Sequence, residues 1–152
     1  MKKLRLTIAL LSIAFAAYAG GYNRTDFNFQ SYKPDTSIGF YTNQTCSSIN
    51  IDHVVSLKDA YDSGASSWST YKKRTFANDK ANHVPSCGRV NSSKGSTGPK
   101  DFLRRSHDGK GLEYEIVAFC EYVQKYYAVK VKYGLALDEN KSDPFIDCGI
   151  TL

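Results

Sequence analysis

The chain has 152 residues, of which 41% are hydrophobic and 23% are charged, and its formal net charge is +5 at pH 7. This length corresponds to one ordinary domain that can bury a hydrophobic core. The sequence contains no internal repeat and no low-complexity tract, which excludes repeat architectures, and no segment after residue 19 looks transmembrane.

Residues 1–19 have the pattern of a secretory signal peptide. They begin with three basic residues, continue with an apolar stretch over 6–18, and end with small residues at Ala17 and Ala19. We expect a bacterial signal with cleavage after Ala19, so that residues 20–152 are secreted or periplasmic and have no membrane partner. The alternative is an uncleaved anchor, but the apolar part is too short to span a bilayer comfortably. Cleavage removes three of the 20 basic residues and none of the 15 acidic ones, which leaves a net charge of +2.

The first half of the mature chain is expected to hold one strand and two helical segments. Residues 20–48 form an irregular arm in this interpretation, with Phe27 and Phe29 alternating as in a short strand. The β-branched residues over 49–57 predict a strand, which leads into a helical turn over 58–63. Ser66 or Ser67 can then cap a helix that runs to about residue 76.

The second half is expected to be mainly helical. A short strand over 82–87 contains Pro85, which indicates an edge or a strand end. A helical turn over 91–94 follows, and Pro99 suits the first position of another short helix. The clearest periodicity predicts a helix over 112–133 that ends at a glycine. Its expected core face carries Ile116, Cys120, Val123, Tyr127 and Val131, and the other faces carry Lys125, Lys130 and Lys132.

Four cysteines remain in the mature chain, at positions 46, 87, 120 and 148. An even number in an oxidising compartment predicts two disulfides. Three pairings are possible. We expect Cys46 with Cys87, which flank the candidate site, and Cys120 with Cys148, which lie on and after the last long helix. The spacing is not C-x-x-C and does not indicate a structural zinc site.

Asp52 and His53 stand side by side in a chain that has only three histidines. Hydrolysis of a phosphodiester requires a group that deprotonates water and a positive charge that neutralises the departing oxygen. A histidine, with an ordinary pKa of about 6.5, suits the first task. A hard divalent cation bound by oxygen ligands suits the second. Adjacent strand residues point to opposite sides, so one could hold a metal while the other addresses the attacking water.

Three residues downstream extend this candidate site. Asn82 opens the second expected strand, and Asn91 and Lys94 share a face if their turn is helical. Asn91 offers an amide oxygen to a cation, and Lys94 offers a positive charge to a phosphate oxygen. An Asp-His pair in a strand is more often structural, but the added residues favour a catalytic role.

These residues carry a resemblance to a known family. The stretch from Ile51 to Leu137, which includes IDHVVSLKDAYDSGASSW, FANDKANHVPSCGRVNSSKG and CEYVQKYYAVKVKYGL, resembles the HNH (His-Asn-His) endonucleases of the ββα-metal superfamily. It is most similar to the branch that includes secreted bacterial nucleases and the nuclease part of modification-dependent restriction enzymes. The resemblance implies a single α+β domain over 20–152. A short antiparallel hairpin and a helix would form its ββα-metal core, surrounded by additional helices and stabilised by disulfides.

The resemblance also implies roles for single residues. His53 matches the general base, Asp52 the carboxylate metal ligand, and Asn82 the residue that ties down the loop between the strands by backbone hydrogen bonds. Asn91 matches the second metal ligand, and Lys94 the lysine of the family motif. The family often has a histidine in place of Asn91, and the asparagine variant is familiar from the HNH domain of RNA-guided CRISPR nucleases. A neutral oxygen ligand favours one Mg²⁺ or Mn²⁺ ion over Zn²⁺.

Residues 89–110 are locally basic, with six basic residues and two acidic ones. Such a region beside the site would attract a polyanion, although a solvated loop explains the charge equally well. We expect contacts to the nucleic-acid backbone from Arg89, Lys100, Arg104 and Arg105, since arginine can bind two phosphate oxygens at once. His83 is expected to face away from the site.

The sequence therefore predicts a monomeric, secreted, metal-dependent endonuclease that cleaves DNA, and RNA as a further candidate substrate, with little sequence preference. The alternative is a catalytically inactive secreted protein on the same fold that binds nucleic acid or another polyanion. A third hypothesis, an antibacterial toxin delivered to rivals, shares the chemistry of the first.

Overall fold

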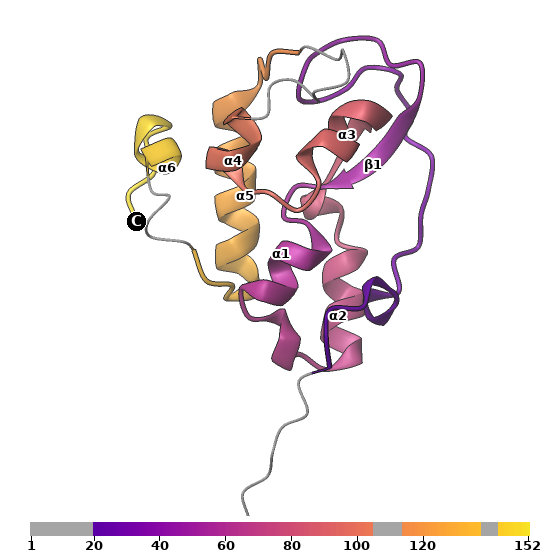
Figure 1. Ribbon diagram of the computed structural model, residues 1–152, viewed down its shortest axis with the longest axis vertical. Coiled ribbons are helices and arrows are strands. Elements are labelled where there is room, and N and C mark those ends of the chain that lie inside the picture. Colours follow the sequence, from indigo (N-terminus) through magenta and orange to yellow (C-terminus); the bar gives the residue numbers. More distant parts are fainter. Residues whose placement is uncertain (1–19, 105–113, 138–142) are drawn as a thin grey trace, which may run out of the picture.

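The computed structural model describes residues 20–104, 114–137 and 143–152 (Figure 1). The expected signal peptide, residues 1–19, lies outside the described residues. In chain order the elements are η1 (Arg24–Phe27), β1 (Ile49–His53), α1 (Leu57–Asp62), η2 (Ala65–Ser67), α2 (Thr70–Ala77), η3 (Lys80–Asn82), β2 (His83–Cys87), α3 (Gly88–Lys94), α4 (Pro99–Arg104), α5 (Phe119–Tyr133) and α6 (Asp143–Asp147).

The fold is α+β, as predicted, and its sheet is a two-stranded antiparallel pair. Ile49 pairs with Cys87 at one end of the hairpin, and His53 pairs with His83 at the other. Helix α3 follows β2 directly, and it contacts both strands. The strands are joined by residues 54–82, which contain α1, η2, α2 and η3. The arrangement of hairpin and following helix is therefore the one that the sequence predicted.

The connection between the strands is held at its two ends by one side chain. Asn82 is fully buried. Its Oδ1 accepts a hydrogen bond from the N–H of Val55 at 2.8 Å, and its Nδ2 donates to the carbonyl of Val55 at 3.0 Å. The Val54 N–H also donates to the Asn82 carbonyl at 2.8 Å. These hydrogen bonds satisfy the buried backbone groups just beyond the end of the strand pairing. Without Asn82 these groups would have no partner there.

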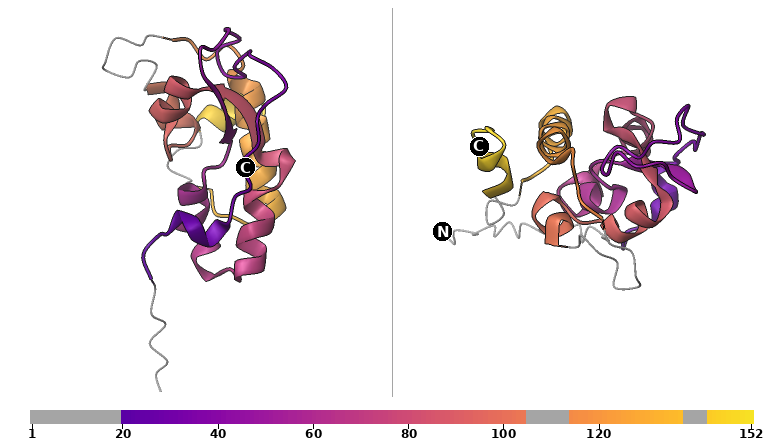
Figure 2. Two further views of the ribbon diagram at one scale, coloured as in Figure 1. Left: turned by 90° about the vertical axis from the view of Figure 1, so that its right-hand side faces the viewer. Right: turned by 90° about the horizontal axis from the view of Figure 1, so that it is seen from above.

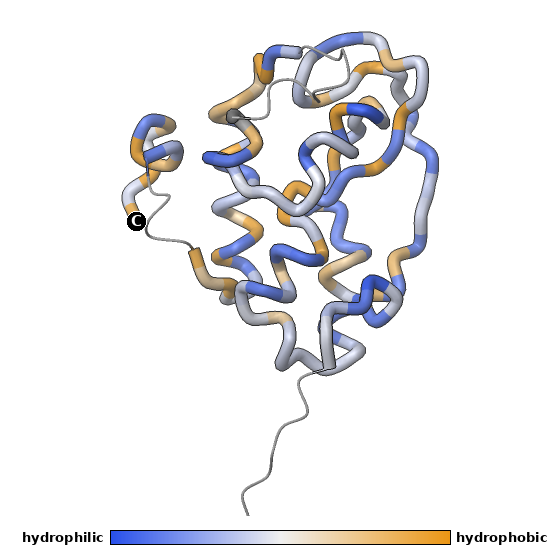
Figure 3. Tube along the Cα trace, viewed as in Figure 1, coloured by the Kyte–Doolittle hydropathy of each residue, from blue (hydrophilic) through white to orange (hydrophobic). Residues whose placement is uncertain are grey.

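Helix α5 has 15 residues and contributes Tyr122, Val123, Tyr126 and Val129 to the core. It contacts α4, α6 and η3 (Figures 1 and 2). The tube in Figure 3 shows apolar and polar positions mixed along α5, as expected for a helix with one buried face. Gly134 ends the helix in the left-handed conformation, with φ 65° and ψ 37°. No helix among the described residues is long and apolar enough to cross a membrane.

Both disulfides have the predicted pairing. Cys46 is bonded to Cys87 with an S–S distance of 2.01 Å, and Cys120 to Cys148 with one of 2.04 Å. The first ties the N-terminal arm, residues 20–48, to the end of β2, and the second ties α5 to the segment after α6. Gly39 packs on the first disulfide so closely that a Cβ there would lie 3.0 Å from the Cys87 sulfur. A larger residue at position 39 would displace the bridge.

Several predicted boundaries in the first half of the domain were wrong. The segment around Phe27 is a short 3-10 helix instead of a strand, and Asn23 caps it. The first strand ends at His53 because Ser56 caps α1, accepting a hydrogen bond from the Asp59 N–H. Helix α2 starts at residue 70, later than expected, because Ser69 caps it instead of the two preceding serines.

The long helix and its buried face also differ from the prediction. Helix α5 begins at Phe119; residues 114–118 precede it, and residues 112–113 lie outside the described residues. Val131 was expected in the core but is 60% exposed, whereas Lys130 is buried. The Lys130 ammonium lies 2.7 Å from the Asp59 Oδ1 and also donates to the Ser63 hydroxyl. Because of this ion pair with a distant part of the chain, the buried face of α5 includes Lys130 instead of Val131. The hydrophobic periodicity of the sequence does not indicate such a pair.

We predict that Asn82→Ala destabilises the protein by about 2 to 4 kcal/mol, because it leaves both buried backbone groups of Val55 without a partner. Asn50→Ala, at an exposed position of β1, should change the free energy of unfolding by no more than about 0.5 kcal/mol. Urea denaturation of the two variants measures the difference. Equal stabilities would contradict the structural role of Asn82.

Candidate active site

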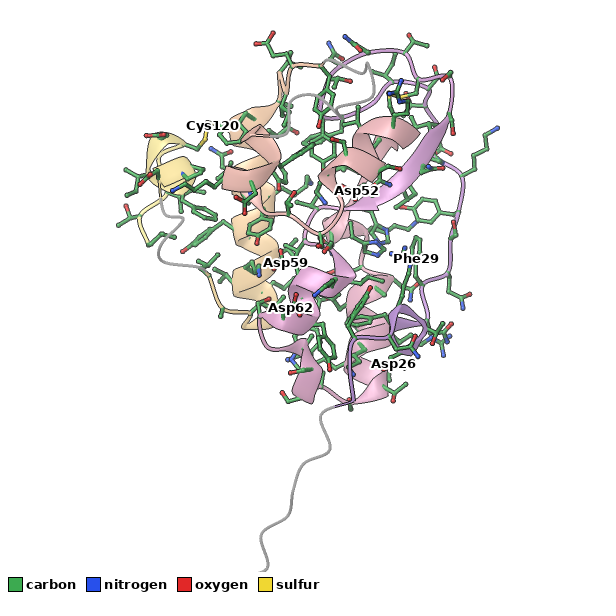
Figure 4. The ribbon with its side chains drawn as sticks, viewed as in Figure 1. Asp26, Phe29, Asp52, Asp59, Asp62 and Cys120 are labelled. Atoms are coloured by element: carbon green, nitrogen blue, oxygen red, sulfur yellow. A yellow bond between two sulfur atoms is a disulfide. The ribbon has the colours of Figure 1, made fainter. Side chains whose placement is uncertain are left out.

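The candidate site is built at the end of β1, where Asp52 and His53 are both 4% exposed. Their side chains have separate sets of partners, as expected for adjacent strand residues. Asp52 contacts Tyr41 and Lys94, whereas His53 contacts Ala77 and Phe29. Figure 4 shows Asp52 near β1 and α3, and Phe29 on the arm beside the strand.

The carboxylate of Asp52 is bound by two buried donors. The Tyr41 hydroxyl donates to Oδ2 at 2.5 Å. The Lys94 ammonium lies 3.1 Å from Oδ2 and 3.3 Å from Oδ1, and it donates to the His53 carbonyl at 2.9 Å. Burial raises the pKa of Tyr41 well above its ordinary value, and the charge of Asp52 raises it further. The Tyr41 hydroxyl therefore stays protonated and remains a donor.

Tyr41 reaches this position because the arm is fixed on both sides of it. The Phe40 N–H donates to the carbonyl of Pro85 on β2 at 2.8 Å, and the Tyr41 carbonyl accepts from the Val117 N–H at 2.9 Å. The Cys46–Cys87 disulfide closes the same loop onto the end of β2. The arm was expected to be irregular, and it lacks long regular elements, but it supplies one of the closest contacts to Asp52.

The imidazole of His53 is held in one tautomer. Its Nε2 lies 2.8 Å from the Ala77 carbonyl, and the Nε2 of His83 lies 2.9 Å from the same oxygen. A carbonyl only accepts hydrogen bonds, so each Nε2 carries the proton. The Nδ1 of neutral His53 consequently has the free lone pair, which a general base needs. The Nδ1 of His83 is 3.1 Å from the Tyr32 hydroxyl, which donates to it.

The surroundings of His53 favour its neutral form. Its pKa is lowered to about 3, chiefly by burial; the hydrogen bond to Ala77 opposes this shift, and the positive charges of His83, Arg24 and Lys94 add to it. The pKa of His83 is also lowered, again chiefly by burial. His53 is therefore uncharged at neutral pH, so its Nδ1 lone pair is not occupied by a proton; the same shift makes it a weaker base than a free imidazole.

A groove of 760 Å³ lies between the arm and the hairpin; neither Asp52 nor His53 lines it, and Phe29 is the lining residue that touches His53. Asn91 of α3 and Ile51 of β1 line it, together with Phe29 of the arm. The Phe29 ring meets the His53 ring edge to face, with centroids 4.6 Å apart. Asn91 is partly exposed, and its side chain has no hydrogen-bond partner within the described part of the chain. Its amide is therefore available to a ligand from the groove.

The oxygen donors of Asp52 and Asn91 are of the type that a hard cation takes, but they face different surroundings: Asn91 lines the groove, whereas Asp52 does not and its carboxylate is bound by Tyr41 and Lys94. The described residues contain no cluster of three or more His, Cys, Asp or Glu side chains that could hold a metal. Asp52 and Asn91 offer only oxygen ligands, and the Asp52 Oδ1 has only the 3.3 Å contact to Lys94. Mg²⁺ keeps several water ligands and needs one or two protein carboxylates. This donor set suits Mg²⁺ or Mn²⁺ better than Zn²⁺.

The structure places several predicted residues differently from the sequence interpretation. Lys94 was expected to offer its charge to a phosphate oxygen. It is fully buried beside Asp52, so its ammonium is not available for that contact. His83 does not face away from the site, because as the strand partner of His53 it lies on the same face, with ring centroids 4.8 Å apart. Asn82 makes the backbone hydrogen bonds expected of it.

Of the predicted phosphate-binding residues, the two whose side chains the structure describes, Arg89 and Lys100, do not line the groove. Arg89 is exposed on α3. Lys100 lies 3.7 Å from Asp143 of α6 and lines a separate cavity of 410 Å³. Arg104 ends α4, its side chain is not described, and Arg105 lies outside the described residues. The arm was not predicted to belong to the site, although its basic and aromatic residues are visible in the sequence.

We predict that Tyr41→Phe destabilises the protein by about 1.5 to 3 kcal/mol, because it removes a buried hydrogen bond to a charged group. Tyr122→Phe is the matched control. Tyr122 is also fully buried among aromatic rings, but its hydroxyl has no hydrogen-bond partner among residues 20–104, 114–137 and 143–152, so its removal should be neutral or stabilising. Chemical denaturation of both variants decides between these outcomes, and an equal loss in both would contradict the role of Tyr41.

We further predict that stability falls as the pH decreases below 6.5. The unfolded chain binds a proton on His53 near pH 6.5, whereas the folded protein resists it until about pH 3. The free energy of unfolding therefore has its full value above pH 6.5, and it decreases progressively as the pH falls toward 3. Urea denaturation between pH 5 and 7.5 should show this slope, and His53→Gln should reduce it. An unchanged slope in the variant would contradict the assignment.

Comparison with known proteins supports a relationship to nucleases. Residues 16–147 match the family described as GmrSD restriction endonucleases, C-terminal domain. A protein described as an uncharacterized secreted protein from Arthroderma benhamiae is 33% identical over 93 residues, which are 60% of this chain. The match spans 41% of that protein, so this chain corresponds to less than half of it. No solved structure matches.

The family match covers most of the chain, including the hairpin, α3 and α5. Asp52, His53, Asn82, Asn91 and Lys94 all lie within it. The chain therefore belongs to the family of the C-terminal domains of GmrSD restriction endonucleases.

Proposed function

We propose that this protein is a secreted, metal-dependent endonuclease of the HNH type that hydrolyses phosphodiester bonds of DNA or RNA with little sequence preference. The observation that carries the proposal is the fixed tautomer of His53, whose free Nδ1 stands at the end of the strand that also carries Asp52. Membership of an endonuclease family supports the reaction class. The two disulfides, and the description of the Arthroderma relative as secreted, support the location.

His53 would act as the general base. Its Nδ1 takes a proton from a water molecule, the water oxygen attacks phosphorus in line, and the bond from phosphorus to the 3′ oxygen breaks. Ala77 keeps the Nε2 proton in place and so preserves the basic Nδ1 throughout. The ordinary contribution of such a base is about 10²- to 10⁴-fold. The departing oxygen takes its proton from solvent.

Asp52 and Asn91 would hold the divalent cation. When bound, this ion supplies positive charge to the phosphate and to the departing oxygen. Lys94 and Tyr41 are positioning residues, because both bind Asp52 and neither lies at the surface. Lys94 also binds the His53 carbonyl, so one ammonium fixes the backbone of the base and the carboxylate of the ligand.

A binding protein without turnover is the second candidate. The near-complete burial of Asp52 and His53 favours it, as does the compensation of the Asp52 charge by Lys94. Such a protein would retard nucleic acid in a gel at low salt without shortening it. The same preparation and the same gel therefore distinguish the two candidates.

We predict that the mature protein nicks plasmid DNA with Mg²⁺ or Mn²⁺ and stops when EDTA is added. His53→Ala should reduce the rate at least about 10²-fold, and added imidazole should restore part of the activity by occupying the space of the lost ring. The rescue shows that the variant is folded. Undiminished cleavage by His53→Ala would contradict the assignment of the base.

We also predict that Asn91→Ala raises the Mg²⁺ concentration required for half-maximal cleavage, by about 10-fold or more, because it removes a metal ligand. Asn50→Ala, which lines the same groove from β1, is the matched control and should leave the metal dependence unchanged. Metal titration of the cleavage rate measures both. An identical metal requirement in the two variants would exclude Asn91 as a ligand.

A further inference from the structure

We infer that the N-terminal arm forms a binding surface for a single strand of nucleic acid. Arg24 and Lys33 contact its phosphates, and Tyr32 stacks on one of its bases. This inference rests on the proposed function, because the groove is lined by Asn91, the proposed metal ligand, and by Phe29, which touches the His53 ring. It adds contacts from the arm to those predicted for the basic residues of 89–110.

The charge of the groove fits a polyanion. Arg24 and Lys33 both line it and both are exposed. Lys80 stands at its edge, with its ammonium 3.1 Å from the centre of the Tyr32 ring. None of the described residues that line the groove is acidic. The local field therefore attracts phosphate, although the net charge of the mature chain is only +2.

The aromatic residues of the groove are fixed in place before any ligand binds. The Tyr32 hydroxyl is bonded to the Nδ1 of His83 at 3.1 Å, and the Lys80 ammonium covers one face of its ring. The Tyr32 ring also lines the groove and is only partly buried. A rigid ring loses little conformational entropy when a base stacks on it, which favours its use as a platform.

The platform is connected to the proposed base through a short chain of contacts. Tyr32 binds His83, and His83 shares the Ala77 carbonyl with His53. Phe29 touches both histidine rings, with centroids 4.6 Å from His53 and 5.4 Å from His83. A base that stacks on Tyr32 would therefore lie at a fixed position relative to His53. Figure 4 shows Phe29 at this junction between the arm and the strand.

Stacking on Tyr32 requires an unstacked base. In a duplex the faces of the bases are covered by their neighbours, whereas a single strand can turn its bases outward onto aromatic side chains. A groove that combines basic residues with aromatic rings is the usual surface for single strands. DNA and RNA share this chemistry, so both are tested below.

The test measures binding without turnover. Fluorescence anisotropy is recorded in EDTA with a labelled 12-nucleotide DNA strand, the matching RNA strand and a DNA duplex. The intact mature protein should bind a single strand more tightly than the duplex. Arg24→Gln with Lys33→Gln should reduce the slope of log affinity against log salt by about 1.4, since each lost phosphate contact contributes about 0.7. Lys72→Gln with Lys125→Gln, two lysines outside the groove, should leave the slope unchanged.

The platform is tested separately. Tyr32→Leu should weaken single-strand binding at least about fivefold, whereas Tyr32→Phe, which keeps the ring, should retain it. Tyr71→Leu is the matched control, because Tyr71 is 81% exposed and does not line the groove. Tighter binding of the duplex, or an unchanged salt slope in the arm double variant, would overturn the inference. Because the assay needs no cleavage, its failure is distinguishable from a failure of the nuclease proposal.

Discussion

The buried carboxylate of Asp52 is the constraint on which the rest of this site depends. A charge that is 4% exposed is costly unless it is paired and hydrogen-bonded. Lys94 supplies the opposite charge from α3, and Tyr41 supplies a hydroxyl from the arm. Removal of Lys94 would leave the buried charge without an opposite charge, and removal of the Tyr41 hydroxyl would leave it with one hydrogen-bond donor fewer. The need to bring these two groups together explains why α3 packs on the hairpin and why a disulfide fixes the arm.

The opposite side of β1 carries an uncharged side chain instead of a charged one. His53 is buried without an acidic partner, so burial lowers its pKa and keeps it neutral. The Ala77 carbonyl then selects the tautomer by accepting the Nε2 proton. One short strand thus presents a fixed anion on one side and a fixed neutral base on the other. This separation is what the proposed hydrolysis requires, since the cation and the attacking water occupy different places around the phosphate.

The N-terminal arm contacts the residues on both sides of β1. Tyr41 orients the carboxylate, Phe29 packs on the base, and Tyr32 is bonded to His83. The Cys46–Cys87 disulfide and the hydrogen bond from Phe40 to Pro85 hold the arm on the hairpin. A segment with only one short helical turn is therefore as much a part of the site as the strands. Its exposed basic residues, Arg24 and Lys33, line the groove beside Asn91.

The family resemblance implied the Asn82 hydrogen bonds, and the disulfide pairing was chosen from three possibilities. The sequence by itself determined the local features: the two strands, the helical turn after the second strand, and the positions of Asp52, His53, Asn91 and Lys94. These depend on short-range preferences and on motif spacing. Only the tertiary structure decided that Lys94 and Lys130 are buried, that His83 stands beside His53, and that Tyr41 binds Asp52. Each of these features depends on a partner from a distant part of the chain or from the paired strand. An ion pair or a buried hydrogen bond between such partners does not change the hydrophobic periodicity around either residue, so the local sequence does not indicate it.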